Sequence, residues 1–132
     1  MEFKEYYSQL GKLLYAIADI DQVISVKEKN KLLEIVKNEL LPIENRQDEF
    51  GINLAYYAEF EFDFLDEEIM DATSAFQSFI DFLERHQTAI DEHTKNVTLQ
   101  IAEELAAAYY NTNFKEKILL DKLKYTLRKI NN

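Results

Sequence analysis

The sequence contains no cysteine, one proline and two glycines among its 132 residues, and each scarcity excludes a class of protein. Without cysteine the chain forms no disulfide, no thiolate zinc or iron–sulfur site and no thiol nucleophile. β-Sandwiches and barrels need many turn residues, and phosphate-binding loops need glycine, so neither fits. Long helices need neither proline nor glycine in their interiors, and the composition therefore favours an all-α protein.

Long apolar runs are missing as well. No stretch approaches the roughly 20 apolar residues that a transmembrane helix needs. The first ten residues, MEFKEYYSQL, lack the basic start and apolar centre of a secretory signal peptide. We therefore expect a cytoplasmic protein that forms a single domain over residues 1–132.

Positive charge is absent from the middle of the chain and concentrated at its end. The formal net charge is −10, and residues 47–84 carry eleven acidic residues but no lysine or arginine. An acidic segment of this length repels phosphate, so we expect no binding to nucleic acid. The last twenty residues are basic and are expected to form a helix that packs near residues 47–84, with Phe114 and the leucines of the helix turned inward. Alternatively, this helix is a docking patch for an acidic partner or an anionic membrane.

Apolar residues recur at three- and four-residue steps along most of the chain, which is typical of amphipathic helices. The pattern predicts helices over residues 3–17, 26–40, 48–57, 71–83, 91–110 and 114–127. Residues 59–65 (EFEFDFL) instead alternate with period two. Because a lone strand would have no partner, we expect an extended turn there, with its phenylalanines in the core. The predicted fold is a single compact all-α domain of about six or seven helices.

An acidic turn joins the first two predicted helices in the stretch AIADIDQVISVKEKNKLLEIV, residues 16–36. A connection this short predicts an antiparallel hairpin of the two helices. The turn carries three candidate ligands for a divalent cation, Asp19, Asp21 and Glu28, which we call the acidic-turn residues. Carboxylates are suitable because hard divalent cations bind oxygen ligands. The alternative is that Asp21 only caps or solvates the turn.

An EF-hand does not account for this turn, although its carboxylates are spaced like part of one. With Glu28 as the last ligand, Ile17 stands where the first carboxylate should be, and Gln22 replaces the glycine that the sharp turn needs. Ser25 followed by Glu28 is instead a capping-box pattern, which predicts a helix start near Val26.

Motifs of known catalytic sites are absent. Neither His86 nor His93 has a glutamate three residues before it, as a di-iron bundle requires, and no HExxH or Gly-x-Ser-x-Gly occurs. Tyrosines stand in adjacent pairs at 6/7, 56/57 and 109/110. Because neighbours on a helix differ by about 100°, we expect one of each pair to reach the surface, where it could contribute to a partner interface.

Residues 13–28, LLYAIADIDQVISVKE, resemble the TerB-like family of tellurite-resistance proteins. The family pattern is an alanine-rich helix, then Asp-Gly-x-Ile-x-x-x-Glu, then a second helix. Asp21, Ile24 and Glu28 match it, whereas Gln22 replaces the glycine. The resemblance implies a compact all-helical accessory module of stress-response or membrane-associated complexes. It also implies divalent-cation binding through Asp21 and Glu28; Asp19 is added from the residues alone.

A weak internal repeat accompanies this motif. Residues 17–36 and 106–125 both contain a helix end, a polar turn and a Lys-Glu-Lys helix start, as two repeated helix–turn–helix units would. The leading hypothesis is a non-enzymatic TerB-like module that binds a protein partner and a divalent cation. Two alternatives are a metal-free structural adaptor and a small hydrolase, which would need paired carboxylates of raised pKa in one cleft.

Overall fold

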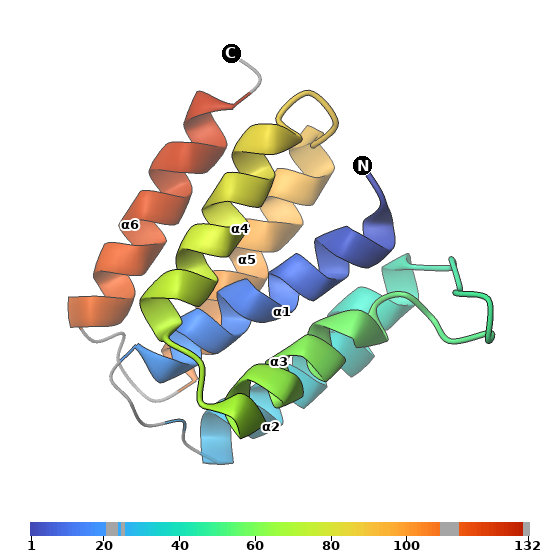
Figure 1. Ribbon diagram of the computed structural model, residues 1–132, viewed down its shortest axis with the longest axis horizontal. Helices are drawn as coiled ribbons and strands as arrows, with labels where there is room; N and C mark the ends of the chain where they lie inside the picture. The colour runs from blue at the N-terminus through green and yellow to red at the C-terminus, as the bar shows by residue number, and fades with distance from the viewer. Residues whose placement is uncertain (21–23, 25, 109–113, 131–132) are drawn as a thin grey trace.

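The computed structural model describes residues 1–20, 24, 26–108 and 114–130, and its secondary structure is helical (Figure 1). Within these residues the chain forms six α-helices and no strand: α1 (Phe3–Asp19), α2 (Val26–Ile35), α3 (Tyr56–Glu68), α4 (Ala72–Arg85), α5 (Glu92–Ala107) and α6 (Phe114–Lys129). The predicted all-α single domain is confirmed.

Helix α1 is the central element, because α3, α4, α5 and α6 all pack against it. Its residues Leu10, Leu13 and Leu14 are completely buried. Gly11 permits the closest of these contacts: a Cβ atom at this position would lie 2.5 Å from the carbonyl oxygen of Ala58 in α3. The α1–α3 contact therefore depends on glycine for its short distance between backbones.

The central position of α1 also corrects the expectation for the first tyrosine pair. Tyr6 and Tyr7 are both buried, at 3% and 5% exposure. Neighbouring residues of a helix can both be buried when other helices cover more than one of its faces. In the second pair, Tyr56 does reach the surface, with 36% exposed, whereas residues 109/110 lie outside the described part of the chain.

The predicted hairpin of the first two helices is only partly realised. Helices α1 and α2 run in opposite directions (Figure 1), but the closest packing of α1 is with α3 and α4. Helix α2 packs against α5, and the Lys29 ammonium lies 2.7 Å from the Asp66 carboxylate of α3. By contrast, the consecutive helices α5 and α6 pack directly. The two halves of the suggested repeat therefore differ in how their helices pack.

Helical structure continues past residue 40, where the sequence predicts the end of the second helix. Helix α2 leads into a single π-helical turn, Val36–Leu40, and then a 3₁₀ turn, Leu41–Ile43, with Pro42 in its first positions. The prediction that a helix opens at Asp48 is wrong. The Asp48 carboxylate instead accepts hydrogen bonds from the amides of Phe50 and Ile52, and Gly51 adopts a positive φ of 81°. Asp48 thus stabilises a turn that precedes α3.

The expectation of an extended turn at residues 59–65 is also wrong, because these residues lie inside α3. Ala58, Phe62 and Leu65 follow one another at helical spacing and are buried. Only Phe62 of the three phenylalanines is in the core; Phe60 and Phe64 are 44% and 54% exposed. The period-two pattern arose because charged residues happen to alternate with both inward-facing and outward-facing phenylalanines.

Aspartate caps begin the next two helices, at the positions where the sequence predicts that these helices start. The Asp71 carboxylate accepts a hydrogen bond from the Ser74 amide at 2.9 Å, and Asp91 accepts one from the Thr94 amide at 2.8 Å. Each bond satisfies an amide that the first turn of a helix leaves unpaired. Helix α5 ends at Ala107, before the predicted end near residue 110.

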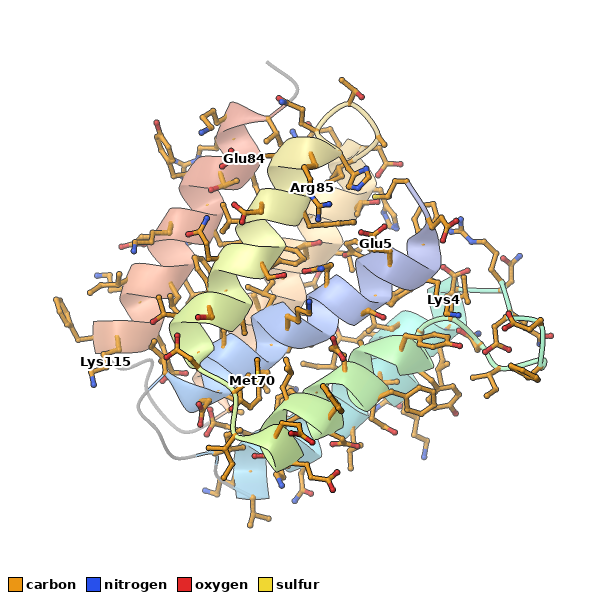
Figure 2. All side chains as sticks on the ribbon, viewed as in Figure 1. Lys4, Glu5, Met70, Glu84, Arg85 and Lys115 are labelled. Atoms are coloured by element: carbon orange, nitrogen blue, oxygen red, sulfur yellow. The ribbon has the colours of Figure 1, made fainter. Side chains whose placement is uncertain are left out.

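Helix α6 packs against α4 and α5 through its buried leucines, which confirms its predicted position beside the acidic segment. The Lys129 ammonium lies 4.0 Å from the Glu84 carboxylate of α4. Phe114, however, is 77% exposed, so the expectation that it packs inward is wrong. The labelled Lys115 side chain extends away from the bundle at the opposite end of α6 (Figure 2).

Candidate functional site

The acidic-turn residues are only partly described by the structure. Asp19 ends α1, and its Oδ2 lies 3.2 Å from the hydroxyl of Tyr15, which also lies 2.7 Å from the carbonyl oxygen of Met70. Burial, followed by the nearby Asp19 carboxylate, raises the pKa of Tyr15 to about 12. The hydroxyl thus remains protonated at neutral pH and links the end of α1 to the turn between α3 and α4.

Glu28 lies in the first turn of α2 and is 95% buried, with 5% of its surface exposed. Asp21 and Ser25 lie outside the described residues, so the structure describes only part of the predicted capping box and of the set of cation ligands. In the part of the chain that the structure describes, no group of three or more histidine, cysteine, aspartate or glutamate side chains is arranged to hold a metal ion. Cation binding by Asp19, Asp21 and Glu28 stays a prediction.

A second candidate site is the outer face of α3, where three aromatic side chains reach solvent. Tyr56, Phe60 and Phe64 follow one another at four-residue intervals, so they form a stripe along one face of the helix. They are 36%, 44% and 54% exposed, respectively. The rings of Tyr56 and Phe60 stack, with centroids 6.2 Å apart and planes inclined by 16°. Side chains of α3 extend from the lower edge of the molecule (Figure 2).

Carboxylates border this stripe. Glu59 and Asp63 precede Phe60 and Phe64 by one position each, and Glu67 and Glu68 lie on the last turn of the helix. Partial burial raises the pKa of Glu59 and of Asp63. The charge of Asp63 adds to the shift of Glu59. For Asp63, the Lys29 ammonium opposes the shift and the Asp66 carboxylate adds to it. We call the stripe and these four acids together the acidic aromatic face.

Two lysines from other elements reach the edges of α3. Lys29 of α2 pairs with Asp66, and the Lys4 ammonium lies 4.9 Å from the centre of the Tyr57 ring. Neither Asp66 nor Tyr57 belongs to the acidic aromatic face. Lys29 also acts on Asp63 through its charge, but the four acids of the face outnumber this one ammonium and keep the potential beside the exposed rings negative.

A pair of carboxyl groups lies where the π-helical turn meets α5. The Nε2 of Gln100 donates to Oε1 of Glu104 at 3.2 Å and to Oε1 of Glu39 at 3.5 Å. Burial, followed by the hydrogen bond with Glu104 and the charge of Glu104, raises the pKa of Glu39 to about 7. The hydrogen bond with Glu39 lowers the pKa of Glu104. Below neutral pH, Glu39 therefore holds a proton that it shares with Glu104.

This carboxyl pair was not predicted from the sequence, because its members are 65 residues apart (104 − 39) and belong to different helices. The π-helical turn changes the direction in which Glu39 points, and no sequence pattern indicated that turn. The two histidines do not join the pair: His86 follows the last residue of α4, and His93 is exposed in the first turn of α5.

No protein-family model, curated protein or solved structure matches this chain. The resemblance to the TerB-like family therefore stays a prediction that rests on residues 13–28. Among the described residues, no helix has both the length and the apolar character needed to cross a membrane.

Proposed function

We propose that the chain is a non-enzymatic helical module that binds a protein partner through the acidic aromatic face of α3. The observation that carries this proposal is the exposure of Tyr56, Phe60 and Phe64 in one stripe. Aromatic residues are enriched at protein interfaces, where burying one large ring removes much apolar surface from water. A contiguous exposed stripe of this kind is a recognised mark of an interaction site.

The packing of α3 supports the same proposal. The helix is anchored through Ala58, Phe62 and Leu65, which lie on its opposite side. The exposed rings therefore contribute little to the stability of the fold, and folding alone gives no reason for large aromatic residues there. A rigid helix that is held from behind also presents its outer side chains with little loss of conformational freedom on binding.

Site-specific photo-crosslinking in cells tests this proposal. A photoreactive phenylalanine analogue replaces Phe64 in one variant and Ile43 in a control, because Ile43 is similarly exposed, at 53%, but lies on the 3₁₀ turn. We expect a discrete protein adduct at position 64 and none at position 43. The adduct should disappear when Glu59 and Glu67 are both changed to lysine. Equal labelling at both positions, or none at position 64, would contradict the proposal.

Cation binding at Asp19, Asp21 and Glu28 is the second part of the proposal, and it rests on the sequence pattern and the TerB-like resemblance. If the turn holds no cation, the chain is a metal-free adaptor that binds through the same face. The TerB-like resemblance would place either form in a stress-response context.

A carboxylate-dependent hydrolase has less support. The Glu39–Glu104 pair supplies one carboxyl group of raised pKa, as such an enzyme needs. However, the described groups that surround the pair are Gln100 and the charged side chains of Lys31 and Glu34, and none of them is an activated nucleophile.

A further inference from the structure

Helix α6 carries an outer face whose chemistry is the reverse of that of α3. Phe114, Ile118 and Tyr125 are 77%, 39% and 67% exposed. At about 100° per residue, positions 114, 118 and 125 fall within a narrow sector of the helix and form a second apolar stripe. Here the border is basic: Lys115, Lys122 and Lys129 lie on one side of the stripe, and Lys117, Lys124 and Arg128 lie on the other. We call these nine residues together the basic apolar face.

The pattern on α6 differs from an ordinary solvated helix surface. A solvated surface needs no apolar residues, yet this one has three at related positions, with cations on both sides. Asp121 is the one acidic residue among the exposed positions of α6 that the structure describes. Lys129 also pairs with Glu84 at 4.0 Å and lies 5.8 Å from the centre of the Tyr125 ring, so it stands at the edge of the face.

The two faces cannot meet within one molecule. Helices α3 and α6 lie on opposite sides of the bundle, with α1 and α4 between them (Figure 1). Both sets of side chains are exposed on these outer helices. Contact between the two faces therefore requires two molecules.

We infer that the acidic aromatic face of α3 binds the basic apolar face of α6 of a second copy, so that the protein associates head to tail. The inference rests on the proposed function, because it names a partner for the same face of α3. Each apolar stripe would cover the other, and the lysines of one copy would lie beside the carboxylates of the next.

Charge selects this arrangement over symmetric alternatives. Two copies joined through α3 would place four carboxylates against four, and two joined through α6 would oppose their lysines. Like charges held together in this way disfavour an interface. A head-to-tail contact leaves one face of each kind unused at the ends, so association continues into longer chains or closes into a ring.

The contact should be weak and sensitive to salt. Helix α3 has 13 residues and is therefore about 20 Å long, which is short for a stable interface. Its charged border is exposed, so salt screens the attraction between the faces. Association is therefore expected at high protein concentration and low ionic strength.

Two variants separate the possible arrangements. In the first, Phe60→Ser and Phe64→Ser disable the face of α3; in the second, Ile118→Ser and Tyr125→Ser disable that of α6. All four positions are exposed, so both variants should keep the helical content and melting temperature of the natural protein. These two properties are measured first, by circular dichroism.

Sedimentation of the natural protein and of the two variants, alone and mixed, then tests the inference. We expect the mean mass of the natural protein to rise steadily with concentration above the monomer value of 15.6 kDa. Each variant alone should remain a monomer. An equimolar mixture should form a dimer and nothing larger, because each variant supplies the one face that the other lacks.

Three results would overturn the inference: a natural protein that stays monomeric, self-association of the first variant through α6, or self-association of the second through α3. Sedimentation with anionic vesicles adds a fourth. If the natural protein binds the vesicles through α6 and remains monomeric, the basic apolar face binds a membrane and not a second copy. If the natural protein is monomeric but a different protein crosslinks at position 64, self-association is refuted and the proposed function of α3 stands.

Discussion

The three phenylalanines of α3 give the sharpest test of how this segment is folded. Phe60, Phe62 and Phe64 alternate in the sequence, and in an extended segment all three would point to the same side. In the helix only Phe62 enters the core, where it is completely buried and its ring packs edge-on against Tyr15 at 5.9 Å. Replacing each phenylalanine by alanine therefore gives different results for the two conformations.

The expected magnitudes follow from burial. Phe62→Ala removes a fully buried ring and leaves a cavity, which should lower the free energy of unfolding by about 3–5 kcal/mol. Phe60→Ala and Phe64→Ala act at positions that are 44% and 54% exposed, and each should change it by no more than about 0.5 kcal/mol. Alanine is also a good helix former, so the substitutions do not destabilise the helix itself.

Equilibrium unfolding in urea, followed by circular dichroism at a helical wavelength, measures all three variants against the natural protein. We expect a large shift of the unfolding midpoint for Phe62→Ala alone. For Phe60→Ala and Phe64→Ala, the slope of the unfolding free energy against urea concentration should be unchanged. Comparable losses for all three substitutions would refute the helical assignment of residues 59–65. They would also remove the exposed stripe on which the proposed function depends.

Three further predictions concern other parts of the molecule. Gly11→Ala should lower the melting temperature, at a cost of about 1–3 kcal/mol, since its Cβ would lie 2.5 Å from the carbonyl oxygen of Ala58; an unchanged melt would contradict the close α1–α3 contact. The raised pKa of Glu39 means that the folded state binds this proton more tightly than the unfolded chain, so stability falls as pH rises from about 4.5 to about 7. Glu39→Gln should remove that fall, which is worth about 1 kcal/mol after allowance for solvent screening. Urea titrations at pH 5 and pH 8 measure the fall, and an equal fall in the variant would contradict the prediction. Calcium, magnesium, manganese or zinc at 100 times its dissociation constant should stabilise the protein by about 2.7 kcal/mol if the acidic-turn residues bind it, and no shift in the melt with any of these ions would exclude cation binding.

Much of the fold follows from local sequence patterns. Caps such as Asp71 and Asp91 act within one helical turn, and apolar spacing depends only on the period of the helix, so both are visible in the sequence. The failures lie where local patterns conflict with tertiary packing. Residues 59–65 match a strand by chance, and α3 became helical because Ala58, Phe62 and Leu65 pack together on α1 and the core.

The candidate surfaces were harder to predict for the same reason. The sequence indicated an abundance of aromatic residues and an acidic middle, but not which rings point outward. That distinction requires the direction of α3 relative to α1, which the close contact at Gly11 determines. The Glu39–Glu104 pair likewise depends on the π-helical turn and on the packing of α2 against α5. Neither is a property of any short stretch of sequence.

The central claim is that the outer face of α3 is a protein-binding surface, and an equilibrium titration tests it most directly. The protein that crosslinks at position 64 is purified and titrated by calorimetry with the natural chain, with the Phe60→Ser, Phe64→Ser variant and with an Ile43→Ser control. If the two rings are central to the interface, the double variant should bind at least about 30-fold more weakly, which corresponds to about 2 kcal/mol. The control should bind within about twofold of the natural chain. Equal affinity of the double variant and the natural chain would contradict the claim.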